Sequence, residues 1–243
     1  MFVNRSAEVI NRRWGLLGFT VFFLGSLIAI QWLFATRSPN LYWLLVGLGM
    51  LQFAAGLWLV SYCCRGQLRL LSIQGWPWAL AALTGLMVLQ EAMASPTLGP
   101  IRGWSMAIID LLRLIVCIGL VEELWFRGVW MTLFKDRPWI AVGVGSLLFG
   151  LFHAAHGVQT MILTAGVGLT FAAARYRGAS VFTLGLAHGL MDWFNQVMFP
   201  GSQFRFDPTL VAWVFPISCI LLTLLLLLMP TRNASTAKPA PPQ

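Results

Sequence analysis

The chain has 243 residues, of which 58% are hydrophobic and only 10% are charged, and its formal net charge is +8 at pH 7. Soluble domains carry about 25% charged residues, so this composition excludes an ordinary soluble domain and indicates a membrane protein. The basic residues stand at the ends of apolar segments instead of forming one patch, which argues against a nucleic-acid partner. The four cysteines are scattered and too few for a disulfide framework or a cysteine-based zinc site.

Apolar segments divide the chain and predict an all-α fold, a polytopic integral membrane bundle of about eight transmembrane helices. A basic arm over residues 1–13 comes first, and the apolar run after it is too long for the core of a typical signal peptide. We expect a single transmembrane domain over residues 1–230 and a disordered, proline-rich polar tail over residues 231–243. The predicted spans cover residues 14–35, 41–64, 76–94, 104–134, 139–156, 160–174, 179–199 and 210–229.

Basic residues are distributed unequally between the two ends of these spans. An even number of spans places both termini on the same side of the membrane, and most basic residues then share that side. The positive-inside rule therefore predicts cytoplasmic N- and C-termini. Only Arg37, Arg102 and Arg205 fall on the opposite side. The residues on the cytoplasmic side are Arg5, Arg12, Arg13, Arg65, Arg69, Lys135, Arg137, Arg175, Arg177, Arg232 and Lys238.

The fourth span carries three charged residues in an otherwise apolar run: Glu122, Glu123 and Arg127. An ionisable group at membrane depth is expensive and by default has a partner and a function. On an α-helix Glu123 and Arg127 lie one turn apart and can form an ion pair, whereas Glu122 points about 140° away from Arg127. Glu122 is therefore the carboxylate without a counter-ion in its own helix.

Three further polar residues, His153, His188 and Asp192, lie inside later spans. If the chain turns near Asp136, Glu122 and His153 lie about 21 and 25 Å from that turn along two antiparallel helices. If it turns again near residue 178, His188 and Asp192 lie about 15 and 21 Å from the same side of the membrane. His188 and Asp192 are four residues apart and share a helix face. We expect the four groups to meet in one layer within the bilayer.

Small residues favour close packing of these helices. Gly185-x-x-x-Gly189 brackets His188 in the seventh span. Ser146-x-x-x-Gly150 repeats the pattern in the fifth span. The pattern is a weak signal by itself because glycine is frequent in membrane helices.

Other polar residues in apolar segments have simpler interpretations. Asp110 stands three residues before Arg113, so we expect the two to neutralise each other. We expect a structural or interfacial role for Glu91, near the end of the third span. His156 lies close to a loop and is expected to be hydrated.

A glutamate beside a histidine, with no serine or cysteine placed as a nucleophile, can activate a water molecule. A second polar cluster facing the reacting carbonyl would stabilise the oxyanion that develops there. Together they describe hydrolysis of an acyl bond, and within a membrane the natural one is a peptide bond. The three motifs, in chain order, are Glu122-Glu123-x-x-x-Arg127, Phe149-x-x-x-His153 and His188-x-x-x-Asp192.

These motifs resemble those of the CAAX-protease and bacteriocin-processing (abortive-infection) family of intramembrane glutamic endopeptidases. The resemblance covers residues 104–199, with the expected order and spacing, and it leaves out the flanking helices. It implies that Glu122 is the general base acting with His153 on a water molecule, and that His188 and Asp192 stabilise the oxyanion. It also implies an integral protein of the bacterial inner (plasma) membrane.

The resemblance leaves several roles open. It implies that Glu123 and Arg127 shape the site or hold the carboxyl end of the substrate. No cofactor is expected, although a zinc ion bound by Glu122, His153 and His188 remains an alternative. The expected partners are the lipid bilayer and a membrane-anchored protein or peptide, cleaved near its C-terminus or in its leader.

One position departs from the family pattern, which has asparagine where this chain has Asp192. An ionised aspartate would repel an oxyanion, so Asp192 is either protonated and donating or fixes the tautomer of His188. We hypothesise the second role, and Asn195, one turn further along, is a spare candidate for the oxyanion site. Two other classes of function remain: a proton-coupled transporter that uses the same groups as a relay, and a non-catalytic immunity or binding protein of the same fold.

Overall fold

The computed structural model describes residues 5–36, 40–63, 72–95, 103–199, 203–204 and 207–229. The tail over residues 231–243, for which the sequence predicts disorder, lies outside the described residues. The same holds for several basic residues used in the topology prediction: Arg37, Arg65, Arg69, Arg102, Arg205, Arg232 and Lys238.

Helices make up nearly all of the described chain, as predicted. Four stretches are π-helical (η1, η2, η3 and η5) and one is a 3₁₀ turn (η4). A two-residue antiparallel ladder joins β1 (Ala94–Ser95) to β2 (Gln203–Phe204). The helices are α1 (Arg5–Thr36), α2 (Leu41–Cys63), α3 (Trp76–Met93), α4 (Trp104–Arg113), η1 (Leu114–Gly119), α5 (Leu120–Glu123), η2 (Leu124–Trp130), α6 (Met131–Leu133), η3 (Ile140–Val144), α7 (Gly145–Phe152), η4 (Ala154–His156), α8 (Val158–Tyr176), α9 (Val181–Trp193), η5 (Phe194–Met198) and α10 (Pro208–Leu228).

Within the described residues these elements join into eight continuous helical segments that match the predicted spans closely. α4 to α6 form the fourth segment, η3 and α7 the fifth, and α9 with η5 the seventh. The first segment differs from the prediction, because α1 already begins at Arg5 and so includes most of the predicted basic arm. The fifth segment ends at Phe152, before the predicted end at residue 156.

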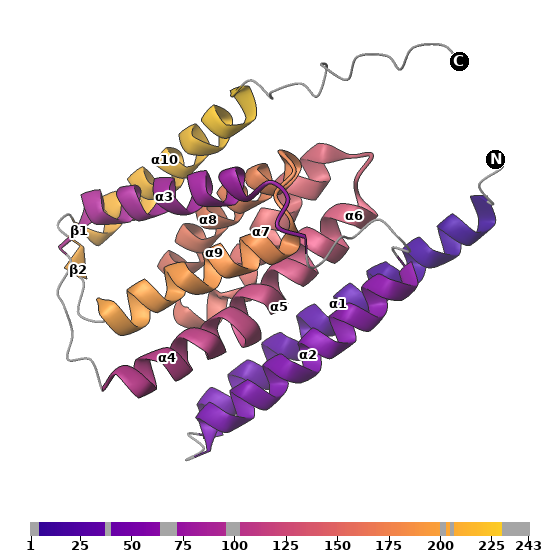
Figure 1. The fold of residues 1–243 in the computed structure, drawn as a ribbon, viewed down its shortest axis with the longest axis horizontal. Coiled ribbons are helices and arrows are strands. Elements are labelled where there is room, and N and C mark those ends of the chain that lie inside the picture. The colour runs from indigo at the N-terminus through magenta and orange to yellow at the C-terminus, as the bar shows by residue number, and fades with distance from the viewer. Residues whose placement is uncertain are drawn as a thin grey trace, which may run out of the picture.

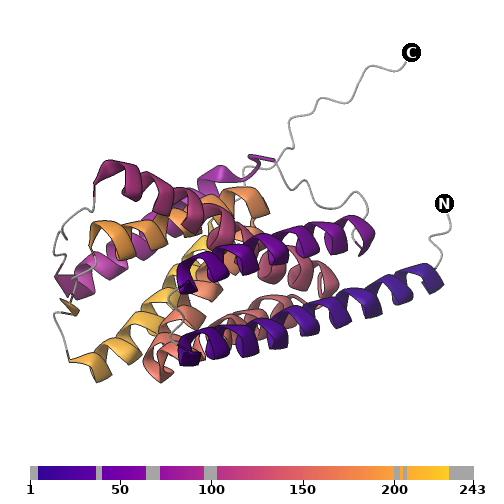
Figure 2. The same cartoon turned by 90° about the horizontal axis from the view of Figure 1, so that it is seen from below.

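Consecutive segments run in opposite directions across the bundle (Figure 1). α1 and α2 lie side by side at one edge of the molecule (Figures 1 and 2). α3 and α10 pack on α8 at the opposite edge. The segment from α4 to α6 lies between these edges and contacts α9, so the charged residues of the fourth span are placed in the interior.

The outside of the bundle carries large apolar side chains. Trp43, Leu51 and Leu221, for example, expose 69%, 68% and 62% of their surface, as side chains that face lipid do. Among the described residues, two helical stretches are long and apolar enough to cross a membrane, Trp104–Leu133 and Thr209–Leu228. These findings are consistent with a membrane protein, while membrane crossing by all eight segments stays a prediction.

Glycines allow α9 to approach the fourth segment closely. A Cβ atom on Gly189 would lie 2.5 Å from the Cα atom of Ile115, and one on Gly119 would clash with the backbone oxygen of Gly185. The Gly185-x-x-x-Gly189 pattern therefore works as predicted, by allowing backbone contact between two helices. This contact brings His188, which lies between the two glycines, next to the glutamates that follow Gly119.

Side-chain caps fix the starts of the last two helices. The hydroxyl of Ser180 accepts a hydrogen bond from the backbone N–H of Thr183 at the start of α9. At the start of α10 the carboxylate of Asp207 accepts from the backbone N–H groups of Thr209 and Leu210. These backbone hydrogen bonds, led by that from Thr209, hold the pKa of Asp207 below its usual range. Both caps satisfy backbone donors that a helix start otherwise leaves unpaired.

Candidate active site

Glu122 and Glu123 end the short helix α5, which lies between the π-helical stretches η1 and η2. π-Helical turns inside α-helices occur frequently at functional sites. Both glutamates are buried, with 8% and 0% of their surface exposed. Two neighbouring acidic side chains are thus held deep in the bundle, where each needs a specific partner.

Glu122 faces two histidines from other segments. Its Oε2 atom lies 3.9 Å from Nε2 of His153 and 3.8 Å from Nε2 of His188. Nε2 of His188 lies 3.9 Å from Oδ2 of Asp192. The structure therefore brings together the four residues for which the sequence predicts catalysis, from α5, the end of α7 and α9. Their catalytic roles stay predictions.

The imidazole of His153 is oriented by its own helix. Its Nδ1 atom lies 2.9 Å from the backbone oxygen of Phe149, and a carbonyl oxygen can only accept. In the neutral ring Nδ1 therefore carries the hydrogen, and Nε2 faces Glu122 as an acceptor. Oε2 of Glu122 is buried and has no hydrogen-bond partner among the described residues. Oε2 of Glu122 and Nε2 of His153 can therefore each accept a hydrogen bond from a molecule between them.

Glu123 orients His188. Its Oε1 atom lies 3.0 Å from Nδ1 of His188 and 3.1 Å from NH1 of Arg127. The predicted ion pair of Glu123 with Arg127 is therefore present. Asp192 lies 3.9 Å from the other ring nitrogen, so the orienting role hypothesised for it stays a prediction. Glu123 is the carboxylate that hydrogen-bonds the ring.

Arg127 is buried, with 2% of its surface exposed. Its NH2 group donates to the backbone oxygen of Gly168 at 3.0 Å, and its guanidinium lies over the ring of Phe149, 4.4 Å from the centroid. It does not line the cavity at Glu122 described below. Of the two roles that the resemblance leaves open for Arg127, the structure favours shaping the site over holding the substrate.

The two secondary candidates lie at the edge of the site. His156 is exposed on η4. Asn195 lies on η5, and its Oδ1 atom accepts a hydrogen bond of 2.5 Å from Nε2 of Gln90. Both line the cavity that contains Glu122, His153 and His188. The sequence did not indicate that Gln90 of α3 holds Asn195 in place.

The distances between the donor atoms can be compared with those of a tetrahedral zinc site. Zinc ligands at 2.0–2.1 Å in a tetrahedral site lie about 3.3–3.4 Å from one another. Oε2 of Glu122 lies 3.9 and 3.8 Å from the two histidine Nε2 atoms, which is wider than this. Within the described residues no group of three or more histidine, cysteine, aspartate or glutamate side chains is arranged to hold a metal ion.

A cavity of about 520 Å³ contains this cluster. Its wall combines the four polar residues with apolar side chains from α2, η1, α7 and α8. Among the described lining residues Arg113 is the one arginine or lysine. The charged and polar lining residues are Gln52, Arg113, Glu122, His153, His156, Thr160, Thr164, His188, Asp192, Asn195 and Gln196.

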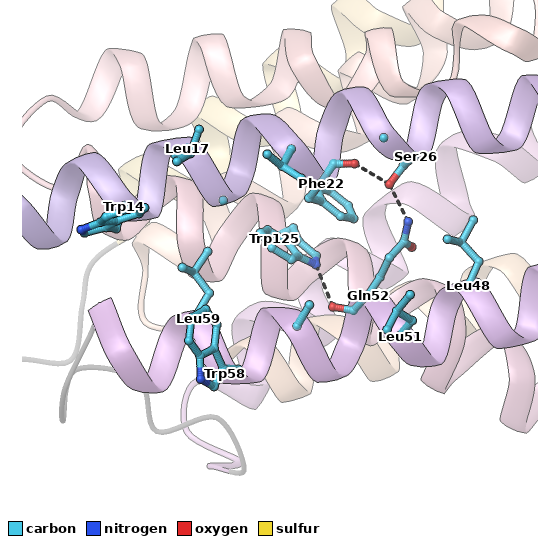
Figure 3. A pocket seen from close by; sticks show the side chains of 14 residues that line it. Trp14, Leu17, Phe22, Ser26, Leu48, Leu51, Gln52, Trp58, Leu59 and Trp125 are labelled. Carbon is cyan, nitrogen blue, oxygen red and sulfur yellow. Dashed lines mark hydrogen bonds between the residues drawn. The ribbon is translucent and has the colours of Figure 1, made fainter.

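A second, apolar groove of about 770 Å³ lies between α1 and α2 (Figure 3). In it the ring of Phe22 stacks on Trp125, with centroids 4.2 Å apart. Gln52 donates to the hydroxyl of Ser26 at 2.5 Å, and its backbone oxygen accepts from Trp125 Nε1 at 3.2 Å. Leu48 and Gln52 line both the groove and the cavity at Glu122, so the two spaces are neighbours.

The part of the chain that carries these residues is similar to a known protein family. Residues 104–194 match the family described as type II CAAX prenyl endopeptidase Rce1-like. The match covers 91 of the 243 residues. The Rce1-like region contains all three motifs, and the resemblance identified from them is therefore confirmed.

A protein of Escherichia coli, described as "Uncharacterized 24.3 kDa protein", is 29% identical to this chain over 146 residues. The aligned part is 54% of this chain and 66% of that relative. No solved structure matches the chain.

Two features of the site were not found from the sequence. The contact of Glu123 with His188 lies within the Rce1-like region, but it joins residues 65 positions apart. Gln52 lies outside that region, in the otherwise apolar helix α2, and so do most of the residues that line the α1–α2 groove. An uncharged polar residue in the middle of an apolar span was the one signal that could have indicated Gln52.

Proposed function

We propose that this protein is an intramembrane endopeptidase that hydrolyses a peptide bond near the C-terminus or in the leader of a membrane-anchored protein. The description of the matched family, a CAAX prenyl endopeptidase, supports this reaction and this class of substrate. The exposed apolar surface of the bundle supports a site enclosed by lipid.

The observation that carries the proposal is the 3.9 Å separation of Glu122 Oε2 and His153 Nε2. Two acceptors at this distance can share one water molecule that donates a hydrogen to each. Glu122 then takes a proton as the water oxygen attacks the peptide carbonyl. Glu122 later gives that proton to the leaving nitrogen as the C–N bond breaks.

The oxyanion that forms on the carbonyl needs donors aimed at it before the reaction begins. Nε2 of His188 faces the same space as Glu122, and its Nδ1 atom donates to Glu123. In this role His188 carries a proton on both ring nitrogens, and Glu123 balances its charge. Asp192 contributes only when protonated, as a second donor. No step of this mechanism uses a metal ion.

The test of the proposal is Glu122→Gln in the full-length protein, with an internally quenched farnesylated peptide that ends in a CAAX sequence as substrate. Removal of a general base is expected to lower kcat by about 10²–10⁴-fold. Glu91→Gln makes the same chemical change in α3, away from the lining of the cavity, and is expected to keep normal activity.

Cleavage that survives Glu122→Gln would contradict the proposed base, and loss of cleavage on addition of a zinc chelator would contradict the metal-free mechanism. The same variant separates the competing classes of function, because a binding or immunity protein would keep its function without Glu122 as a base. A transport relay needs a polar path to both membrane faces.

A further inference from the structure

The cavity that contains Glu122 is lined from one half of the bundle. Along α2, the fourth segment and α8 the lining stops at Gln52, Glu122 and Val167, although each of these helices continues beyond that point. Along α7 and α9, which run the other way, the lining begins only at Phe149 and His188. Because consecutive segments alternate in direction (Figure 1), all of these lining residues lie in the half where α2, α4 and α8 begin.

Exposed residues mark the mouth of the cavity. Among the described lining residues three are exposed: Ala155, His156 and Gln196. Ala155 and His156 belong to η4, which follows α7, and Gln196 belongs to η5, which follows α9. Both stretches lie at the end of the bundle where α2, α4 and α8 begin. The cavity therefore opens at this end, next to the turn that follows His153.

Toward the opposite end the fourth segment is closely packed. The residues of η2, Leu124–Trp130, are all buried, and none of them lines the cavity. The neighbouring groove between α1 and α2 is apolar; apart from indole rings, its polar lining side chains among the described residues are Ser26 and Gln52. These two hydrogen-bond to each other. The described residues thus form a polar route to Glu122 from the mouth and none through the groove.

That route runs along α8. Thr160 and Thr164 line the cavity one turn apart, so they share a helix face, and His156 stands one turn before them. The hydroxyl of Thr160 donates to the backbone oxygen of His156 at 3.2 Å, and that of Thr164 donates to the backbone oxygen of Thr160 at 2.8 Å. Each hydroxyl oxygen can still accept a hydrogen bond from water. A hydrolase has to admit water as well as peptide, and this face leads water from the mouth toward Glu122.

The mouth lies at the less basic end of the molecule. The start of α1, the turn after α6 and the turn between α8 and α9 lie toward the other end (Figure 1). The positive-inside rule makes the end with more basic residues cytoplasmic. The mouth then faces the extracytoplasmic side. The exposed or partly exposed basic residues at the cytoplasmic end are Arg13, Lys135, Arg137, Arg175 and Arg177.

We propose that the cavity opens on the extracytoplasmic face of the membrane, so that the protein cleaves membrane-anchored proteins whose cleavable segment lies outside the cytoplasm. The inference rests on the proposed endopeptidase function and adds the compartment from which the substrate enters. It favours segments that have been exported across the membrane over tails that stay in the cytoplasm.

Thiol labelling tests the opening without turnover. Cys117 lines the cavity and is a native reporter once Cys63→Ser, Cys64→Ser and Cys219→Ala remove the other thiols. The full-length protein, in spheroplasts and in inside-out membrane vesicles, is treated with a small sulfonated methanethiosulfonate, whose charge keeps it from crossing the bilayer. Thiols that stay unmodified are then detected, after denaturation, by a gel shift with a polyethylene glycol maleimide.

Three further variants add Cys117→Ala and one new cysteine each. Gln196→Cys reports on the mouth and Thr164→Cys on the interior of the cavity. Arg137→Cys, at an exposed position in the turn after α6, is the control at the other end. We expect Cys117, Thr164→Cys and Gln196→Cys to react in spheroplasts and to be protected in inside-out vesicles until detergent is added. Arg137→Cys should show the reverse.

Reaction of any of the three cavity thiols in inside-out vesicles overturns the proposal, as does reaction of Arg137→Cys in spheroplasts. A cavity closed to both faces, in which neither Cys117 nor Thr164→Cys reacts before detergent, overturns it as well. Cleavage that depends on Glu122 in a protein labelled from the cytoplasmic face keeps the proposed function and loses only this inference. Labelling from the extracytoplasmic face together with cleavage that survives Glu122→Gln does the opposite.

Discussion

At the residue scale, Glu123 connects the catalytic candidates to the buried interior. One of its oxygens lies 3.0 Å from Nδ1 of His188 and 3.1 Å from Arg127. Because neither Glu123 nor Arg127 lines the cavity, any effect of the two on the proposed reaction passes through other groups. Glu123 is thus a positioning residue for His188, and the ion pair with Arg127 holds Glu123 in place.

We predict that Glu123→Gln lowers kcat by about 10–100-fold with little change in KM, because the histidine loses the partner that fixes its ring and its charge. The single variant also leaves Arg127 buried without its counter-charge, which is strongly destabilising. The double variant Glu123→Gln, Arg127→Met removes both charges, and Arg127→Met alone keeps the hydrogen bond to His188. Steady-state kinetics with melting temperatures on the three proteins separate the two effects.

If the double variant melts near the temperature of the wild type but remains slow, Glu123 positions His188. Normal kcat in the double variant would mean that the hydrogen bond to His188 serves folding alone. Glu123→Asp, which keeps the charge on a shorter side chain, should recover part of the lost rate.

At the scale of elements, the contact of α9 with the fourth segment determines whether the site exists. Gly119, Gly185 and Gly189 allow the two backbones to touch, and His188 reaches Glu123 from this contact. π-Helical turns before and after α5 change the helical repeat at the two glutamates. The direction in which each glutamate points is therefore set by this local geometry together with the packing of α9.

We predict that Gly189→Ala destabilises the protein by about 1–3 kcal/mol, because the added methyl group would lie 2.5 Å from the Cα atom of Ile115. The same change should lower activity, since it moves His188 away from the fourth segment. Gly47→Ala in α2 is the matched control, as a Cβ atom there meets nothing within 4 Å. Melting temperature and cleavage rate are the measurements.

For the control we expect unchanged activity and an equal or higher melting temperature, because alanine is the better helix former. A Gly189→Ala protein as stable and active as the wild type would show that α9 can shift without disturbing the site.

At the scale of the whole molecule, the described chain has a basic end and a less basic end. The start of α1, the turn after α6 and the turn between α8 and α9 lie toward the same end (Figure 1). Exposed or partly exposed basic side chains gather there: Arg13, Lys135, Arg137, Arg175 and Arg177. α10 also finishes toward this end, where Arg177 donates to the backbone oxygens of Leu227 and Met229. This arrangement supports the predicted cytoplasmic termini.

We predict that a fluorescent protein fused to either terminus folds and emits in bacterial cells, whereas alkaline phosphatase fused there is inactive. Phosphatase fused after Gly157, at the opposite end of the bundle, should be active, because the positive-inside rule places that end outside the cytoplasm. Active phosphatase at either terminus would contradict the predicted orientation or the predicted number of spans.

The sequence by itself determined the helical segments and the residues of the motifs. Apolar runs of membrane length specify helices, since backbone groups in lipid must be satisfied within the segment. Spacing of three or four residues also determined the local ion pairs, Asp110 with Arg113 and Glu123 with Arg127, because such neighbours share a helix face.

Only the tertiary structure decided how separate helices meet. The hydrogen bond from His188 to Glu123, the burial of Arg127 away from the cavity and the place of Arg113 on its wall all depend on how one helix is rotated against another. That rotation is set by small residues and side-chain packing contributed by two segments at once. The periodicity of one segment shows which residues share a face of that helix, but not which face of another helix they meet. Contacts between segments were therefore found only in the folded chain.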